Sequence, residues 1–392
     1  MGRTVTLVLV DASGTLLGAL PPFEVPVPWW PEVADVVAVA RSRDGVDLQV
    51  LRLLHADPDR WPGGEVTYLA QVTGSAPVGL APIEVDLSPH PNRAAYAEPG
   101  GPAATVGWGL AALAALGTPG AVAVQQRTWN LSAIWRLDVA GEPVAWLKQV
   151  PRFFRHEPAV LGLVAGVAPG LAPPVLAAGE QGRMLLAHVP GTDQHDAGLD
   201  LRARIAEQWH PIQTTFAGRV DHLLAAGVPD RRLTVESLAA VAQPYLETID
   251  GLPKVIEDLP ARLDALAGCG MPDTLVHGDL HPGNTRAAGG TVVIMDWGDS
   301  TAGHPALDIL RLAGGLPDAD AEELIAAWAL RWRVAAPGSD PRRAIDLLRP
   351  VAELRAATVY AGFLAAIEPA ERPYHLADVP AHLTAAARTA LR

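Results

Sequence analysis

Residues 276–284 read Val-His-Gly-Asp-Leu-His-Pro-Gly-Asn, and residues 292–297 read Val-Val-Ile-Met-Asp-Trp. Each stretch approaches its polar residues through apolar ones, as a buried strand does. The first carries Asp279 and Asn284, and the second delivers Asp296. Three oxygen-bearing side chains therefore come from two adjacent strand ends. Phosphoryl transfer requires such a set, because a carboxylate must orient and deprotonate a hydroxyl while an amide and a second carboxylate hold Mg²⁺.

The pattern His277-x-Asp279-x₄-Asn284, followed by Asp296, resembles the catalytic and metal-binding loops of the aminoglycoside phosphotransferase and choline kinase family. These are small-molecule kinases with a protein-kinase-like fold, and the resemblance spans about residues 120–320. It implies an α+β fold with a β-rich N-lobe and a helical C-lobe. It also implies that Asp279 is the catalytic base, that Asn284 and Asp296 ligate Mg²⁺, and that ATP or GTP donates the phosphoryl group.

Two further residues of this segment are expected to support the loop. The resemblance implies that His277 props it through hydrogen bonds. It also implies that Asp308, in the sequence Pro-Ala-Leu-Asp, braces it. For His281 two interpretations stay open, since the side chain either lines the site or only packs.

A kinase loop predicts an upstream lysine on a strand and a glutamate on the helix that follows. Residues 144–150 supply this lysine, Lys148, between apolar neighbours, and Glu157 follows nine residues later. A lysine in a largely buried strand is costly unless it is paired. The resemblance implies that Lys148 binds nucleotide phosphates and that Glu157 orients it.

The expected phosphate-binding loop lies at residues 127–133. It contains no Gly-x-Gly-x-x-Gly sequence, but backbone amides near Asn130 and Ser132 are candidates for phosphate contact. These two residues complete the predicted nucleotide site.

The remaining chain divides by composition and pattern. We predict an α/β cap domain over residues 1–90, of unknown role, and a linker with a helix over 91–120. The kinase N-lobe follows over 121–191. The helical C-lobe, over 192–392, is interrupted by a short island of loop and strand at 275–297.

Composition limits the possible partners. The 392 residues include 30 basic and 43 acidic side chains, for a net charge of −13, which disfavours nucleic-acid binding by bulk charge. Residues 121–191 are the exception, with six basic and four acidic groups, so a nucleotide is expected there. The single cysteine excludes an intrachain disulfide. Because no stretch reads as a signal peptide or membrane span, we expect a cytoplasmic protein with no membrane partner.

The segment after Asp296 is short and reaches the next predicted helix at about residue 306. It leaves no room for a peptide platform, so the expected acceptor is a small-molecule hydroxyl: an aminoglycoside, a sugar or amino sugar, or a related amino alcohol. Three carboxylates, Asp299, Glu353 and Glu368, would suit a cationic acceptor.

Two other functions stay open from the sequence. A nucleotide-binding pseudokinase or regulatory module would keep the fold without turnover. A metallophosphoesterase would use the His-Gly-Asp-Leu-His segment as a metal cluster, although no downstream Gly-Asn-His accompanies it.

Overall fold

The computed structural model describes residues 2–60, 62–75 and 77–390. The chain forms two compact units. Unit 1 comprises Met1–Arg155, Val175–His188 and Ala366–His375, and unit 2 comprises the three intervening and following segments, His156–Pro174, Val189–Ala365 and Leu376–Arg392. The mixture of sheets and helices confirms the predicted α+β class.

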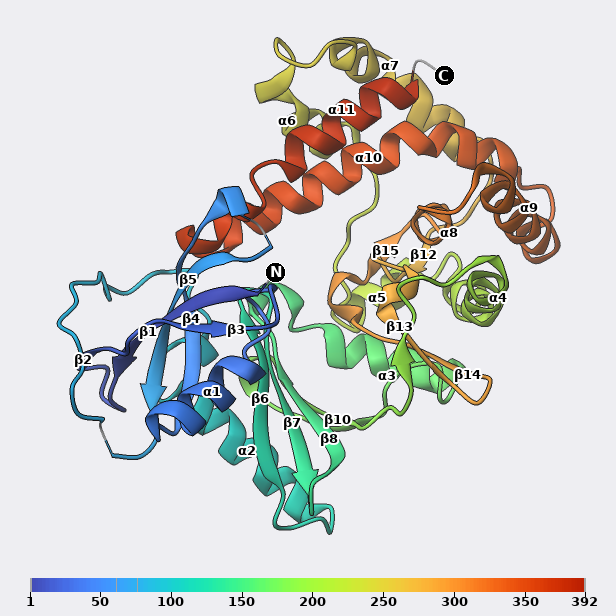
Figure 1. Ribbon diagram of the computed structural model, residues 1–392. Helices are drawn as coiled ribbons and strands as arrows, with labels where there is room; N and C mark the ends of the chain where they lie inside the picture. The colour runs from blue at the N-terminus through green and yellow to red at the C-terminus, as the bar shows by residue number, and fades with distance from the viewer. Residues whose placement is uncertain (1, 61, 76, 391–392) are drawn as a thin grey trace. The chain divides into compact units, whose positions relative to one another are not determined.

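The first sheet of unit 1 has the order β2-β1-β5-β4, with β3 pairing β1 on the side (Figure 1). Its strands are β1 (Arg3–Val10), β2 (Leu16–Ala19), β3 (Phe23–Val25), β4 (Leu48–Ala56) and β5 (Gly64–Val72). Only the β1–β5 pair is parallel.

Strand β1 is buried on both faces, which explains its continuous apolar sequence. Val5, Leu7 and Leu9 pack in a core that includes Val36 of α1 (Ala34–Asp44), whereas Val8 and its partners pack on the other face. Helix α1 ends at Gly45, whose φ of 66° suits a left-handed C-cap.

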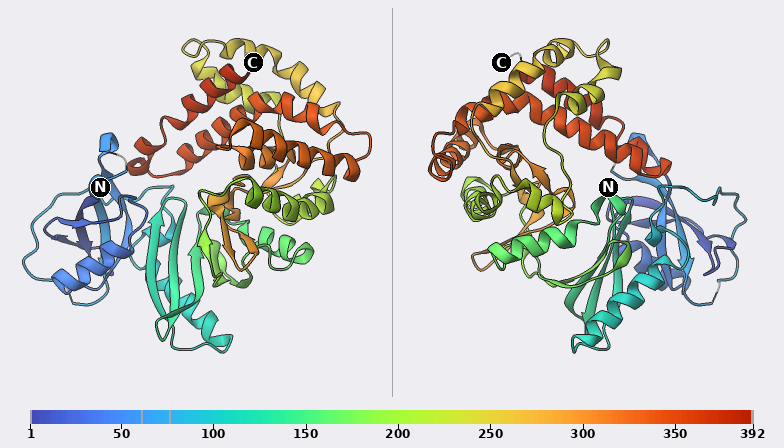
Figure 2. Two further views of the ribbon diagram at one scale, coloured as in Figure 1. Left: turned by 45° about the vertical axis from the view of Figure 1, so that its right-hand side comes forward. Right: turned by 180° about the vertical axis from the view of Figure 1, so that it is seen from behind.

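The second sheet of unit 1 is antiparallel, in the order β6-β7-β8-β10-β9. Its strands are β6 (Val122–Trp129), β7 (Ser132–Val139), β8 (Glu142–Gln149), β9 (Val175–Ala178) and β10 (Arg183–Ala187). Helix α2 (Gly101–Ala115) covers one face (Figure 2). Gly109 permits this close packing, since a Cβ there would lie 2.8 Å from the side chain of Leu147.

Unit 1 also contains a segment from near the C-terminus of the chain. Residues 366–375 include the short helix η8 (Pro369–Tyr374), which lies beside β4 and the β6–β7 turn. The Tyr374 ring packs against Trp30 at a centroid distance of 5.5 Å, with the two ring planes tilted by 45°. Nothing in the sequence pattern predicts this return of the chain.

Unit 2 is mainly helical, as predicted from residue 199 onward. Its helices are α3 (Glu157–Val167), α4 (Leu199–Phe216), α5 (Val220–Ala225), α6 (Val235–Ala242), α7 (Leu252–Ala267), α8 (Ala306–Ala313), α9 (Asp318–Ala335), α10 (Pro341–Ala366) and α11 (Asp378–Ala390). Its short strands are β11 (Thr192–Asp193), β12 (Thr274–Val276), β13 (Thr285–Ala288), β14 (Thr291–Ile294) and β15 (Thr301–Gly303), and they form the sheets β11-β13-β14 and β12-β15.

The two compact units combine segments that lie apart in the sequence, and the predicted domain boundaries remain predictions. Residues 1–90 share one unit with the second sheet, and α3, expected within 121–191, belongs to the helical unit. Within the described part of the chain, no helix is both long and apolar enough to span a bilayer.

Candidate active site

The loop that follows β12 is fixed by a buried strand pair. β12 is fully buried and runs antiparallel to β15, so that Val276 lies opposite Thr301. At Gly278 the backbone turns with a φ of +89°, and a Cβ at this position would lie 2.2 Å from the carbonyl oxygen of Asp299. Only glycine fits so close to the neighbouring loop in this conformation.

Asp308, near the start of α8, holds the backbone of this loop. One carboxylate oxygen accepts the His277 amide at 3.0 Å, and the other accepts the Gly278 amide at 3.1 Å. Trp209 Nε1 and Gln213 Nε2 also donate to this carboxylate, at 2.7 and 3.2 Å. Burial raises the pKa of Asp308, and these hydrogen bonds to the ionised form oppose that rise.

His277 is fully buried and links the two loops. Its Nδ1 accepts the Asp279 amide at 3.3 Å, and its Nε2 lies 3.0 Å from the carbonyl oxygen of Met295. Because an amide can only donate, Nδ1 carries no proton and Nε2 donates to Met295. Burial lowers the pKa of His277, which agrees with a neutral ring.

The carboxylate of Asp279 is surrounded by donors. Asn284 Nδ2 donates to its Oδ2 at 3.1 Å and to its backbone oxygen at 3.0 Å. Arg311 Nε, from α8, donates to Oδ1 at 2.7 Å. His281 Nε2 lies 3.4 Å from Oδ2, and its Nδ1 accepts the Gly283 amide, so Nε2 carries the proton.

These donors set the charge of Asp279. Burial alone would raise the pKa of this carboxyl group, but the hydrogen bond from His281 and the charge of Arg311 outweigh burial and hold the pKa well below its usual range. Asp279 is therefore ionised at neutral pH. It can orient a hydroxyl group as an acceptor, and it is a weak base.

Asp296 lies two residues after the end of β14. In the β13–β14 pair, Thr285 lies opposite Ile294, and the Met295 amide donates to the carbonyl oxygen of Asn284 at 2.7 Å. Asp296 has φ 57° and ψ 72°, a left-handed conformation that costs energy in a residue with a side chain. Such strain is typical of functional positions.

Glu157 belongs to this part of the molecule as well. It is the first residue of α3, is 1% exposed, and its Oε1 accepts the Trp297 amide at 3.3 Å. The predicted partner of Lys148 therefore contacts the backbone directly after Asp296.

The donor set near Asn284 and Asp296 fits Mg²⁺. Asn284 uses its Nδ2 toward Asp279, and its Oδ1 makes no hydrogen bond among the described residues. Those residues contain no group of three or more His, Cys, Asp or Glu side chains that could hold a metal. Mg²⁺ suits such a sparse site, because proteins hold it with one or two oxygen ligands while substrate phosphates and water supply the rest.

The predicted nucleotide residues of unit 1 have the following positions. Lys148 is half-buried in β8 and lies between Ile134 of β7 and Met184 of β10. The Oγ of Ser132 accepts Trp129 Nε1 at 3.1 Å. Lys148 therefore lies on a strand, as predicted, and this strand has a neighbouring strand on each side.

Asn130 lies in the β6–β7 turn, but its groups are already bonded within unit 1. Its amide donates to both carboxylate oxygens of Glu371, at 3.0 Å each, and its Oδ1 accepts the Glu368 amide at 3.0 Å. Glu371 is 1% exposed, and burial raises its pKa to about 8. We expected the Asn130 amide to contact a phosphate, but in this structure it donates to the carboxyl group of Glu371.

Sequence reasoning missed two of these residues. A signal for Arg311 exists, because it follows Asp308 by three residues and positions three apart share a helix face. No signal exists for Glu371, which is 241 residues from Asn130.

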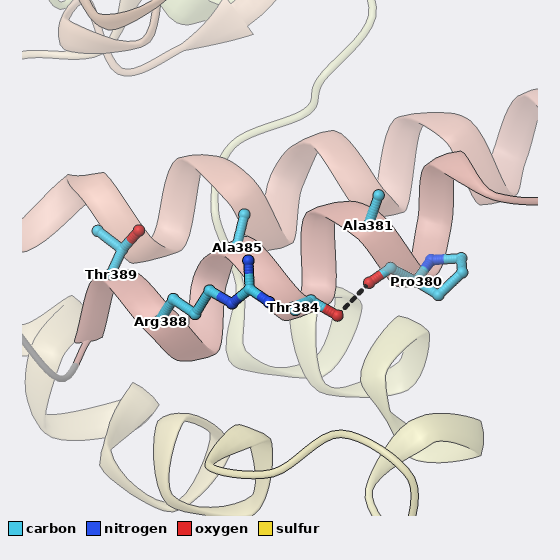
Figure 3. A pocket seen from close by; sticks show the side chains of 6 residues that line it. All are labelled: Pro380, Ala381, Thr384, Ala385, Arg388 and Thr389. Atoms are coloured by element: carbon cyan, nitrogen blue, oxygen red, sulfur yellow. Dashed lines mark hydrogen bonds between the residues drawn. The ribbon is translucent and has the colours of Figure 1, made fainter.

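A pocket lies on α11 (Figure 3). Its lining comes from one helix: Pro380, Ala381, Thr384, Ala385, Arg388 and Thr389. The hydroxyl of Thr384 is used within the helix, donating to the Pro380 oxygen at 2.7 Å. None of the loop side chains described above lines this pocket.

Comparison with known proteins identifies a family. The model of the phosphotransferase enzyme family matches residues 142–348, more than half of the chain. No protein of curated function matches the sequence.

Solved structures share the fold at low sequence identity. A macrolide 2'-phosphotransferase from Brachybacterium faecium is 18% identical, with a TM-score of 0.50 over 71% of this chain and 98% of its own. A putative fructosamine-3-kinase from Thermobifida fusca is also 18% identical, with a TM-score of 0.49 over 71% of this chain and 98% of its own. A choline/ethanolamine kinase family protein from Mesorhizobium loti is 17% identical, with a TM-score of 0.45 over 66% of this chain and 90% of its own.

Proposed function

Because the chain belongs to the phosphotransferase enzyme family and is a small-molecule kinase, we propose that it transfers the γ-phosphoryl group of ATP or GTP to a hydroxyl group, with Mg²⁺. The observation that carries this proposal is the pairing of Asp279 with Asn284 in the loop beside Asp296.

Asp279 is the residue that positions the acceptor hydroxyl. Its ionised carboxylate accepts the hydroxyl hydrogen bond and fixes the oxygen for attack. A weak base suffices, because the transition state of phosphoryl transfer is loose and catalysis depends mainly on positioning and electrostatic stabilisation. Arg311 and His281 keep the carboxylate charged and oriented.

Asn284 and Asp296 are the proposed Mg²⁺ ligands, through the amide Oδ1 and a carboxylate oxygen. When bound, Mg²⁺ neutralises charge on the transferred phosphates. Asn284 has a second function in this arrangement, since its Nδ2 holds the carboxylate of Asp279. The metal site and the acceptor site are therefore joined through one side chain.

The proposed nucleotide site uses Lys148 and Glu157, with Ser132 and Asn130 in the β6–β7 turn. We assign the sheet β6–β10 to a nucleotide-binding lobe, the helices of unit 2 to an acceptor lobe, and residues 1–90 to a cap. In this proposal the Asn130 amide donates to a phosphate only after its hydrogen bond to Glu371 is broken.

The acceptor is a small molecule such as an aminoglycoside, sugar, amino sugar or amino alcohol. The segment between Asp296 and α8 consists of η7 (Trp297–Asp299), β15 and three further residues, which supports this choice over a peptide. The idea of a cationic acceptor has less support. Glu353 pairs with His382 at 2.7 Å, and Glu368 lies in unit 1.

A nucleotide titration followed by a turnover screen tests this function. We expect ATP to bind with Mg²⁺ and to lose affinity when EDTA removes the metal, because the protein offers only two oxygen ligands of its own. ATP consumption is then screened over aminoglycosides, hexosamines, maltose, choline-like amines and homoserine. Absence of Mg²⁺-dependent nucleotide binding would refute the proposal.

A further inference from the structure

Arg311, on α8, contacts the proposed catalytic carboxylate through one nitrogen of its guanidinium group. Its Nε donates to Asp279 Oδ1 at 2.7 Å. The two terminal nitrogens, Nη1 and Nη2, donate to no residue in the described part of the chain. Arginine and carboxylate groups often pair through two parallel hydrogen bonds. Here a single bond anchors the guanidinium, and its terminal donors are available to a ligand.

Helix α8 fixes this arginine beside the loop that follows β12. The carboxylate of Asp308, three residues earlier on the helix, accepts the His277 and Gly278 amides at 3.0 and 3.1 Å. Positions three residues apart lie on one helix face. Asp308 therefore holds the backbone of the loop while Arg311 holds the side chain of Asp279, and both contacts depend on the same packing of α8.

The donors around Asp279 determine where an acceptor hydroxyl can bind. Oδ2 accepts Asn284 Nδ2 at 3.1 Å and lies 3.4 Å from His281 Nε2. Oδ1 accepts only Arg311 Nε among the described residues. Because a carboxylate oxygen accepts about two hydrogen bonds, the open position is on Oδ1, next to the guanidinium. The side chains of Asp279 and Arg311 are 35% and 54% exposed, so a ligand reaches both.

We propose that Arg311 is an acceptor-binding residue and that it selects alcohols with a second oxygen on the carbon next to the reacting hydroxyl. This inference rests on the proposed function, because it takes Asp279 Oδ1 as the partner of that hydroxyl. The hydroxyl donates to Asp279, and the neighbouring oxygen accepts a hydrogen bond from Nη1 or Nη2 of Arg311. The acceptor class is then a vicinal diol, such as a sugar.

The charge of Arg311 disfavours a protonated amine at the position of the second oxygen. An ammonium group cannot accept a hydrogen bond, and it would lie beside the positive guanidinium. The site has no excess positive charge for an anion either, because Arg311 and Asp279 form an ion pair. An acceptor with an amine next to the reacting hydroxyl is therefore poorer than the matching diol.

Three ring compounds test the proposal by binding alone: the vicinal cis-diol of cyclohexane, cyclohexanol, and the vicinal cis-amino alcohol of the same ring. Each is titrated by ligand-observed NMR into the full-length chain with saturating Mg²⁺ and a non-hydrolysable ATP analogue. We expect the diol to bind about tenfold more tightly than cyclohexanol, since its second oxygen gains a hydrogen bond from a charged donor. The amino alcohol should bind more weakly than cyclohexanol.

Arg311→Met separates ligand binding from a purely structural role, because methionine has a similar length and no donor. The preference for the diol should disappear, and the affinity for cyclohexanol should change little. The amino alcohol should bind more tightly than it does to the unmodified chain, since Asp279 then attracts it without an opposing charge. A role confined to holding Asp279 would weaken all three compounds alike and keep their order.

Arg311→Lys keeps the positive charge but not the planar fork. We therefore expect the preference for the diol to shrink while the amino alcohol stays the weakest of the three compounds. The matched control is Arg349→Met on α10, because Arg349 pairs with Glu322 of α9 at 3.1 Å. This variant should leave the three affinities unchanged.

Circular dichroism and the urea midpoint check that each variant is folded. Equal affinity for the diol and cyclohexanol, no detectable binding of the diol, or an unchanged order of the three compounds in Arg311→Met would overturn the proposal. Failure of the proposed function gives a different result, because the ATP analogue itself would not bind, and this inference would fall with it.

Discussion

Replacing Glu371 by glutamine should change how the stability of the protein depends on pH. In the folded chain the carboxyl group is buried against the Asn130 amide and has a pKa of about 8, against an ordinary value of 4.5. The other charged groups nearby are Glu368, which raises this pKa further, and Arg93, which pairs with Glu368. Glutamine has nearly the same shape but cannot ionise.

The sign and size of the effect follow from proton binding. Between pH 4.5 and pH 8 the folded state holds a proton on Glu371 that the unfolded state has lost. The free energy of unfolding therefore falls as pH rises, by about 1.4 kcal/mol per pH unit, and levels off above the folded pKa. From pH 6 to pH 9 the carboxyl group costs the protein about 2–3 kcal/mol.

Urea unfolding at pH 6, 7, 8 and 9, followed by tryptophan emission, measures this cost. Trp30 packs against Tyr374 of η8, so its emission reports on this region. Titration of all other groups cancels in the difference between Glu371→Gln and the unmodified chain. Between pH 6 and pH 9, we expect the free energy of unfolding of the variant to rise by about 2–3 kcal/mol relative to that of the unmodified chain.

The matched control is Glu180→Gln, an exposed glutamate of the same unit, which should leave the curves unchanged. A pH-dependent difference below about 0.5 kcal/mol for Glu371→Gln would show that the carboxyl group ionises freely in the folded chain. Our account of the Asn130 contact would then be wrong.

Three further substitutions test the proposed catalytic loop. Gly278→Ala should destabilise the protein by at least about 1–2 kcal/mol in urea unfolding, because the φ of +89° and the contact with the Asp299 oxygen exclude a Cβ; an unchanged midpoint would refute this. Asp308→Asn should lower the free energy of unfolding by about 2–3 kcal/mol, since an amide cannot accept all four donors, and kcat/KM should fall with it; full activity would contradict the bracing role. Asp279→Asn should reduce kcat by about 10²–10⁴, while titration shows unchanged nucleotide affinity; a loss of nucleotide binding instead would place Asp279 in the nucleotide site.

The loop that carries Asp279 and Asn284 could be predicted because its determinants are local. Asp279, Asn284 and Asp296 lie within eighteen residues, and apolar strands deliver them in a fixed order. The strand at Lys148 and the helix that begins at Glu157 are likewise short-range features, and both are present as predicted.

The features that sequence could not supply depend on contacts between distant segments. Glu371 meets Asn130 across 241 residues, and no local pattern distinguishes it from an exposed glutamate. The composition of residues 366–375 likewise gives no sign that this segment belongs to unit 1.

The late arrival of residues 366–375 has a consequence for synthesis on the ribosome. The chain passes between the units after residues 155, 174, 188, 365 and 375, so unit 1 receives residues 366–375 only after residues 189–365 of unit 2 have been synthesised. The 241 residues that separate Asn130 from Glu371 take roughly 10–50 s to synthesise at bacterial and eukaryotic rates. For that interval the β6–β7 turn and the Trp30 ring lack their covering helix. A chain that stops before residue 366 would leave them uncovered permanently, and both parts of the protein, not the C-terminal one alone, would be incomplete.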